Sequence, residues 1–430
     1  MKFKILLKVA ILVLICSSLG YSKHRNGGNN GNPFQFAQSP NTVVLQRIRL
    51  NANNVDAFFQ NTGIFDQNTT SGNLAGLIWP KGSGKTASFT AGLSIGCYIG
   101  TANGPKMAQV MASYKGEYAP SAIKSVGGKP TLDNDTKFKM YTVRAGDNAN
   151  NNPDYANWGL MIPYGAPYAD VNKNGQWDDG IDLPGQINAG QTIFECMSDA
   201  MVSERNPGEG FGGGVTDPIL FAEVHWTSWS YTLPGLEDLQ FINWVVINKG
   251  DSAWRRTYMG VIVDPDLGEA NDDYIGCDTS QYLGFCYNGD DNDPIYGAAP
   301  PAFGMDYFKS PYDRINGRYL GLTSFTFFTN NGNSPPPCET DPNGTPYPAY
   351  LNLTGVKNDS SIFMDPTQTP FKKTKFCYPG DPESNTGWTE FKGSLQNCGR
   401  DTTGTPLLTN PVGDRRFIFS SGSDNFVVSP

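Results

Sequence analysis

Two neighbouring apolar stretches constrain the fold of this chain more than any other feature. They read ILFAEVHWTSWSYTL, from residue 219, and LEDLQFINWVVINKG, from residue 236. In the second stretch apolar side chains alternate at period two on both faces: Leu239, Phe241, Val245 and Ile247 on one, and Ile242, Trp244 and Val246 on the other. This pattern predicts an antiparallel strand pair whose second member is a central strand. The segment RRTYMGVIVDPD, from residue 255, is expected as the third strand.

The composition extends this prediction to the whole chain. Glycine (49 residues) and proline (31 residues) are abundant and, with Asn and Asp, separate short apolar runs, while helical periodicity is hard to find. We therefore predict a mainly β protein with antiparallel β-sandwich-type domains and long Gly/Asn/Asp/Pro-rich loops. A glycine-rich break at residues 206–218 suggests one β-rich domain over residues 43–215 and a second, sandwich-type domain over residues 216–430.

The N-terminus predicts export. Lys2, Lys4 and Lys8 precede the apolar run VAILVLIC, and small residues follow it. This is the pattern of a signal peptide over residues 1–22. A flexible Gly/Asn-rich leader is expected over residues 23–42. The apolar run is too short to span a bilayer, and no later stretch is long enough, so no transmembrane segment is expected in the mature chain. Loss of three lysines changes the formal charge from -9 to -12, which disfavours nucleic acid as a partner.

The first strand after the leader is expected within NTVVLQRIRL, which ends at Leu50. Two alternatives remain open for it. The strand either belongs to the sheet of its own domain or is donated to the open sheet edge of another copy.

Eight cysteines agree with an oxidising compartment. Cys277 and Cys286 bracket a short loop and are predicted to form a disulfide. Two of Cys338, Cys377 and Cys398 are expected to form a second one. Cys97, within the strand-like GLSIGCYIG, is expected to be a buried thiol.

The segment WPKGSGKTASF resembles the end of a phosphate-binding loop, but Trp79 stands where that loop requires a glycine. The residues after Lys85 alternate as a strand does. We therefore predict a hairpin turn at KGSGK and no ATP binding.

A calcium loop is the most specific chemical motif. In DVNKNGQWDDGID, oxygen-bearing side chains recur at alternate positions and are followed by a glycine at the turn. This spacing can wrap a cation that requires six to eight oxygen ligands. The position of the usual bidentate glutamate is Ile181, and the flanking segments are not helical, so the loop resembles the helix-free calcium loops of extracellular proteins. The predicted ligands are Asp170, Asn172, Asn174, Gln176 through its carbonyl, Asp178, and Asp179 or Asp182. The alternative is an Asx-rich surface turn without an ion.

A second acidic region can be read either as another calcium site or as a solvated loop. Its carboxylates are Asp264, Asp266, Glu269, Asp272, Asp273, Asp278, Asp290, Asp291 and Asp293. A glycosidase would use two of them, or one with Glu223, but the spacing selects no pair. The chain has two histidines, His24 in the leader and His225 in a strand, so zinc sites built from several histidines are excluded. A Ser-His-Asp hydrolase triad would have to use His225, and no GxSxG elbow between a strand and a helix accompanies it.

Four segments together resemble large, uncharacterised secreted proteins of the Bacteroidota and allied phyla, many of them cargo of the type IX secretion system. They are LIWPKGSGKTASFTAGLSIG, VDPDLGEANDDYIGCDTSQYLGFCYNGDDND, PPAFGMDYF and DRRFIFSSG. The resemblance implies extracellular β-domains, of which this chain would be an N-terminal portion, and carries over no catalytic residue.

The expected function is that of a secreted or cell-surface structural or adhesive protein, stabilised by calcium and disulfides and able to assemble with itself. The alternative is a carbohydrate-binding or carbohydrate-active module that acts on surface glycans. Clustering of Trp226, Trp229 and Trp244 over a groove with two carboxylates would favour this alternative. Burial of these tryptophans would favour assembly.

Overall fold

The computed structural model describes residues 43–430 except 71, 73, 101–105, 113–115, 206–217, 331, 333, 334, 344, 396, 397 and 399–411. The predicted signal peptide, the leader, His24 and nearly all of the glycine-rich break lie outside the described residues. The described part is mainly β and its sheets are antiparallel, as the sequence predicts. No helix of this part is long and apolar enough to cross a membrane.

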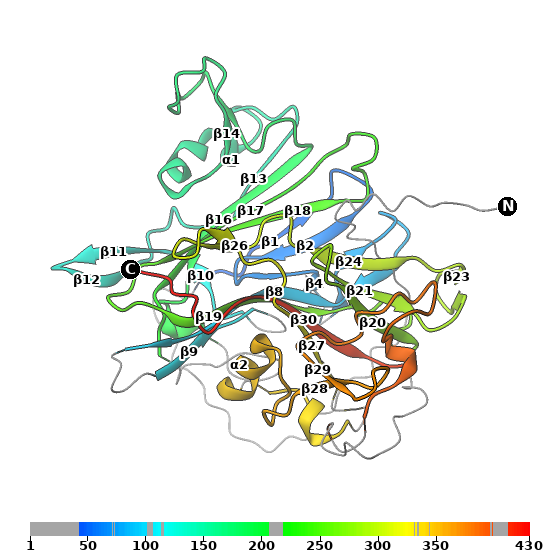
Figure 1. Cartoon of the computed structure of the whole chain (residues 1–430). Helices are drawn as coiled ribbons and strands as arrows, with labels where there is room; N and C mark the ends of the chain where they lie inside the picture. Colours follow the sequence, from blue (N-terminus) through cyan, green and yellow to red (C-terminus); the bar gives the residue numbers. More distant parts are fainter. Residues whose placement is uncertain are drawn as a thin grey trace, which may run out of the picture.

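The largest sheet has ten strands and runs through the middle of the molecule (Figure 1). Its order is β27 (Ser324–Thr329), β30 (Arg415–Gly422), β19 (Arg255–Asp264), β8 (Thr90–Ile99), β3 (Ile64–Phe65), β2 (Asp56–Gln60), β6 (Leu77–Ile78) and β7 (Thr86–Ser88), with β1 (Arg47–Leu50) paired to β2 and β9 (Lys106–Val110) paired to β8. Strand β1 therefore belongs to the sheet of its own chain, which is the first of the two alternatives for this segment.

A second sheet has five strands and packs on one face of the first. It contains β10 (Ala119–Pro120), β13 (Tyr141–Arg144), β16 (Gln191–Ser198), β17 (Ala222–Ser230) and β18 (Gln240–Asn248). Phe59 of the large sheet lies 5.5 Å from Trp226 between ring centroids, and Phe65 lies 6.1 Å from Trp244. These aromatic contacts join the two sheets into one hydrophobic core, which is the sandwich arrangement.

Smaller elements complete the fold. A three-stranded sheet of β20 (Asp273–Asp278), β21 (Leu283–Asn288) and β24 (Ala302–Asp306) adds to the same core. The two-stranded pairs are β4 (Gln67–Asn68) with β5 (Leu74–Ala75), β11 (Ala122–Val126) with β12 (Lys129–Asp133), β14 (Tyr168–Ala169) with β15 (Leu183–Pro184), β22 (Asn292–Asp293) with β23 (Gly297–Ala298), β25 (Tyr312–Asp313) with β26 (Arg318–Tyr319), and β28 (Phe363–Asp365) with β29 (Lys372–Thr374). Among the described residues the α-helices are α1 (Pro153–Ala156) and α2 (Pro346–Thr354), and the 3-10 helix η1 spans Trp158–Tyr164.

Helix α2 covers the opposite face of the large sheet, and two glycines make this contact possible. A Cβ atom at Gly96 of β8 would lie 2.8 Å from the Tyr350 ring, and one at Gly260 of β19 would lie 2.7 Å from Leu353. Both distances are too short for real atoms, so the absence of side chains on two adjacent strands forms the seat of the helix.

Two sequence predictions are corrected by the sheet topology. Strands β17 and β18 pair as predicted, but β18 ends its sheet instead of lying at its centre. Strand β19, expected beside them, pairs with β8 and β30 in the other sheet. Both sheets also draw strands from either side of residue 215, so the predicted boundary does not divide the chain into two separate sheets.

The cysteines agree with the predictions only in part. Cys338 and Cys398 form a disulfide, and Cys97 is a buried free thiol, as expected. The predicted bond between Cys277 and Cys286 is wrong, because both are free thiols. In the β20–β21 hairpin Cys277 lies opposite Gly284 and Cys286 opposite Ile275, so strand pairing closes this loop with the two cysteines offset along the ladder.

The KGSGK turn is a hairpin, as predicted. It connects β6 to β7, which pair antiparallel, and the Trp79 amide donates a hydrogen bond to the Lys85 carbonyl at 3.0 Å. Gly82 and Gly84 have the positive φ angles that such a turn requires.

Candidate functional site

The calcium-type loop, residues 170–182, closes the hairpin between β14 and β15. The residues next to the loop are strands and not α-helices, which agrees with the prediction of non-helical flanks, although the 3-10 helix η1 includes residues 161–164 of the upstream segment. Asp170 accepts hydrogen bonds from the amides of Asn174, at 3.1 Å, and Gly175, at 2.7 Å. The Asp170 carboxylate thus sits inside a tight turn of its own backbone.

Asp178 and Asp182 complete this arrangement. One Asp178 oxygen accepts hydrogen bonds from the side-chain amides of Asn172, at 2.7 Å, and Asn174, at 2.5 Å. Asp182 is buried, and its two oxygens accept the amides of Val171 and Asp178. These hydrogen bonds tie Asp170, Asn172, Asn174, Asp178 and Asp182 into one loop, but the carboxylates of Asp170, Asp178 and Asp182 are not among the acidic groups of the described residues that lie within 4.8 Å of one another.

The two remaining predicted ligands, Gln176 and Asp179, differ in their relation to this group. Gln176 takes part through its amide, which donates to the Asn174 side-chain oxygen at 2.8 Å. Asp179 is exposed. Asp182 is thus hydrogen-bonded to the loop backbone, whereas Asp179 faces solvent, and the choice between them as the last ligand stays a prediction.

The second acidic region does not gather into one site. Asp293 accepts the amides of Ile295 at 2.6 Å and Glu269 at 2.9 Å, and Asp273 accepts the Leu267 amide at 3.0 Å. These contacts are those of carboxylates that hold turns. Asp264, Asp266 and Asp414 do lie within 4.8 Å of one another, but Arg416 forms ion pairs with Asp264 and Asp414.

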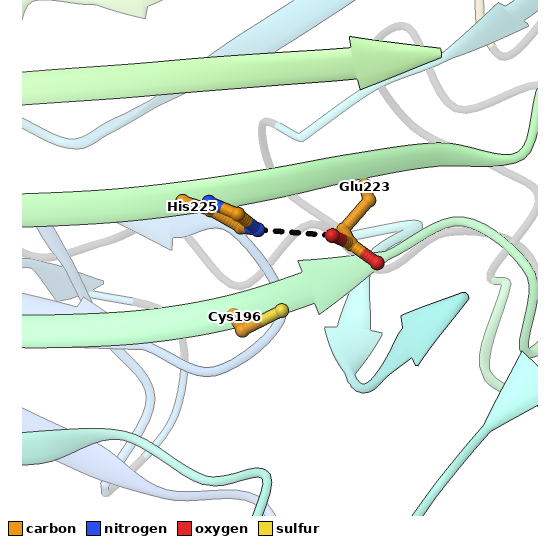
Figure 2. A group of neighbouring side chains, drawn as sticks. All are labelled: Cys196, Glu223 and His225. Atoms are coloured by element: carbon orange, nitrogen blue, oxygen red, sulfur yellow. Dashed lines mark hydrogen bonds and ion pairs between the residues drawn. The ribbon is translucent and has the colours of Figure 1, made fainter. Parts of the chain in front are cut away.

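A different group of side chains, not predicted from the sequence, meets on the outer face of the smaller sheet. Cys196 on β16 lies directly opposite His225 on β17, and Glu223 precedes His225 by two residues on the same face. Figure 2 shows the three side chains side by side across the two strands. The sulfur, a carboxylate oxygen and an imidazole nitrogen all lie within 4.8 Å of one another.

Each member of this group has a defined partner. His225 Nε2 lies 2.9 Å from Glu223 Oε1, and the Lys249 ammonium lies 3.3 Å from the same oxygen. Glu223 Oε2 accepts the Ile123 amide at 2.7 Å. The Cys196 thiol donates to the Ser121 carbonyl at 3.4 Å. The cluster thus connects β16 and β17 to the segment that runs from β10 into β11.

The surroundings of the cluster shift the pKa values of the Cys196 thiol and the Glu223 carboxyl in opposite directions. Burial, with the charges of Glu223 and Glu195, raises the pKa of the Cys196 thiol. Burial also raises the pKa of Glu223, but the hydrogen bonds from His225 and Ile123, together with the Lys249 charge, outweigh it and leave the pKa lowered. Glu223 is therefore a carboxylate at neutral pH, and Cys196 is a protonated thiol, which is a poor nucleophile.

Hydrophobic side chains pack around the thiol. Cys196 belongs to a satellite core with Phe194 of β16 and with Trp158 and Met161 of η1. The Tyr164 ring meets the His225 ring edge to face, with centroids 6.4 Å apart. The cluster is nearly closed to solvent, since the side-chain exposure is 12% for His225 and 2% for Glu223.

The tryptophans do not line a common groove. Trp226 is buried and faces the large sheet, as does the half-buried Trp244. Trp229 lies on the other face and stacks on Phe241, with centroids 5.4 Å apart, and Phe241 in turn stacks on Phe308 at 6.2 Å. Trp226 and Trp244 therefore pack in the core between the two sheets.

No described strand pairs with the outer edge of β18. Strand β18 is the last of its sheet, and no backbone hydrogen bond from the described part of the chain reaches its far side. The Lys249 amide donates to the Phe221 carbonyl. Because hydrogen-bonded pairs alternate along an antiparallel ladder, the backbone groups of Ile242, Trp244 and Val246 point away from β17.

Two other terminal strands are protected. The Thr142 amide of β13 donates to Asp154 at 3.0 Å, and the Thr142 carbonyl accepts the Asn152 side chain at 2.9 Å. On β27, the Phe325 amide donates to the Lys375 carbonyl at 2.9 Å, and the Phe325 carbonyl accepts the Cys377 amide at 3.0 Å. The free edge of β18 differs from both.

Comparison with known proteins returns no matching protein family, curated protein or solved structure.

Proposed function

We propose that this chain is a secreted or cell-surface structural protein that assembles with itself through the edge of β18. The observation that carries the proposal is the free, nine-residue edge of this strand. Its sequence QFINWVVIN contains no charge and no proline, the residues that usually protect an edge. It is apolar on both faces, which is typical of strands with neighbours on both sides.

A second copy of β18 is the occupant that fits this edge. Antiparallel pairing about a two-fold axis at Trp244 would place Ile242 opposite Val246 of the other copy, and Gln240 opposite Asn248. No like charges meet, and the outward backbone groups of each strand find partners on the other. Such an isologous contact extends the five-stranded sheet across two molecules.

The calcium-type loop and the N-terminal pattern support an extracellular setting. Asp170, Asp178 and Asp182 supply carboxylate oxygens of the kind that calcium prefers. The predicted signal peptide and the resemblance to secreted proteins of the Bacteroidota point to the same compartment. In this proposal the ion stabilises the β14–β15 hairpin and takes no part in the contact between copies.

One observation favours the glycan-binding alternative. Trp229, Phe241 and Phe308 form a stack whose outermost ring, Phe308, is 63% exposed. Aromatic faces of this kind stack on sugar rings. A glycan role would appear as binding to a polysaccharide that is lost in Phe308→Ala while the oligomeric state stays unchanged.

The assembly proposal is tested with the double variant Asn243→Lys and Val245→Lys of the mature chain. Both side chains are exposed, so the fold of the monomer should survive. In the two-fold register each introduced lysine lies opposite a lysine of the other copy, and like charges directly opposite destabilise a strand pair. We expect dimers or larger assemblies of the wild type, measured by sedimentation and negative-stain microscopy, and monomers of the variant.

The matched control adds two lysines elsewhere, at Val126 and Ile315, which are 55% and 73% exposed. This variant should assemble as the wild type does. A monomeric wild type, or equal assembly of the β18 variant and the control, would contradict the proposal.

A further inference from the structure

The Cys196–Glu223–His225 cluster carries an inference that is independent of the assembly contact. Its three side chains offer a sulfur, a carboxylate oxygen and an imidazole nitrogen, all within 4.8 Å of one another. We propose that these three residues bind a zinc ion that fastens β16 to β17.

The geometry of the cluster suits this ion. Zinc binds thiolate sulfur at about 2.3 Å and imidazole nitrogen at about 2.0 Å in a tetrahedral arrangement, which sets neighbouring ligand atoms about 3.5 Å apart. The distances between ligand atoms in the cluster lie on either side of this value. His225 Nε2 and Glu223 Oε1 are 2.9 Å apart, and no two of the three ligand atoms are more than 4.8 Å apart. Small side-chain rotations are enough to open the His225–Glu223 contact around an ion.

The donor set selects zinc over calcium and magnesium. Calcium and magnesium prefer oxygen ligands throughout, whereas a thiolate with an imidazole suits zinc. Three protein ligands leave a fourth position, which a water molecule can reach on the side where His225 is partly exposed. The site is otherwise closed by the core around Trp158, so its role is to stabilise the sheet.

The zinc ion can replace the Lys249 ammonium as the positive charge next to Glu223. The Lys249 ammonium lies 3.3 Å from the carboxylate, but its side chain is 38% exposed and can swing into solvent. The Cys196 thiol gives up its present hydrogen bond to Ser121 and its proton when it becomes a ligand. One thiol proton is released to solvent for each zinc ion bound, and no electron is transferred.

The experiment must distinguish zinc bound by the cluster from zinc bound elsewhere on the protein. The full mature chain is first treated with a chelator and then kept in excess calcium, so that the loop at Asp170 is saturated if it binds calcium at all. Zinc is added and followed by calorimetry, and cobalt(II) serves as a spectroscopic probe because a thiolate ligand gives it a charge-transfer band. We expect one equivalent of zinc and a thiolate–cobalt band.

Two variants and one control assign the site. Cys196→Ser should abolish the thiolate–cobalt band, and His225→Gln should weaken zinc binding at least tenfold. Cys97→Ser, which changes another buried free thiol on β8, should leave both unchanged. Zinc should raise the melting temperature of the wild type and of the control but not that of Cys196→Ser.

The proposal can also be tested on the wild type without any variant. Cobalt binding to the wild type without a thiolate band would overturn the proposal even if Cys196→Ser failed to fold. Zinc binding of equal strength in the wild type and in His225→Gln would also overturn it. Neither result bears on assembly through β18.

Discussion

Glu195 is a buried carboxyl in the core between the two sheets. It lies on β16 opposite Trp226, on the core face of the sheet, and it is completely buried. Neither carboxyl oxygen has a hydrogen-bond partner among the described residues. Burial accordingly raises the pKa of Glu195 well above its ordinary value. A charge in this position is costly, because the interior cannot solvate it as water does.

The pH dependence of stability follows from this shift. A carboxyl whose pKa is raised in the folded state binds more protons when folded than when unfolded, so the free energy of unfolding falls as pH rises from its ordinary pKa through the folded one. We expect Glu195→Gln to raise the free energy of unfolding at pH 8, by about 1–3 kcal/mol, and to raise it less at pH 5. Denaturant melts at the two pH values measure this difference.

The exposed Glu383 provides the control, since Glu383→Gln should change stability little at either pH. A Glu195→Gln variant that is less stable than the wild type at pH 8 would mean that the carboxylate has a stabilising partner.

At the scale of elements, the β14–β15 hairpin and helix α2 each depend on a local feature of the sequence. The hairpin loop is held by its own carboxylates, and the helix is seated on two glycines. The alternating Asp and Asn residues predicted the loop without any knowledge of the sheet. Helix α2 was not predicted, because proline occupies its first turn and its apolar residues follow no clear helical period, although Pro346 and Gly355 are typical of a helix start and end.

Calcium should stabilise the protein through the hairpin loop. An ion that binds only the folded state raises the free energy of unfolding by about 2.7 kcal/mol at a concentration of 100 Kd. We expect the calcium-dependent shift in melting temperature to disappear in Asp170→Ala and to persist in Asp179→Ala, because Asp170 lies within the turn and Asp179 is exposed. Scanning calorimetry with calcium and with a chelator measures the shift. A shift in Asp170→Ala as large as that of the wild type would exclude this loop as the binding site.

The seat of α2 should not tolerate a methyl group. Gly96→Ala would place its Cβ 2.8 Å from the Tyr350 ring and 3.0 Å from Leu353, so the helix must move away from the sheet. Overpacking of this kind costs about 1–3 kcal/mol. Gly332→Ala is the comparison, because its nearest neighbour would be 3.3 Å away on an exposed turn. Chemical denaturation of both variants tests the expectation, which fails if their stabilities are equal.

At the scale of the whole molecule, the sequence predicted the class of fold and several local pairings but not the order of the strands. Alternation identified β17 and β18 as partners, since the two segments are close in the chain. It could not place β19, because residues 255–264 find their neighbours β8 and β30 far away in sequence. Apolar residues on both faces suggested a central strand, yet β18 lies at an edge, and this conflict supports the assembly proposal.

The Cys196–Glu223–His225 cluster shows the same limit. The spacing Glu-x-His on a strand places Glu223 and His225 on one face, and this could be read from the sequence. Cys196 joins them only through the register of β16 against β17, where a slip of one residue would turn the thiol to the opposite face. The sequence alone does not fix that register.

The place of β30 in the large sheet has a consequence for the order of events during synthesis. Strand β30, residues 415–422, lies between β19 and β27, so the ladder that joins them waits for a segment made long after residue 264. A growing or translocating chain that has not yet delivered residue 422 keeps β19 without one of its neighbours. The large sheet can therefore be completed only after residue 422 has been made, and its folding depends on contacts between residues far apart in sequence, which form slowly.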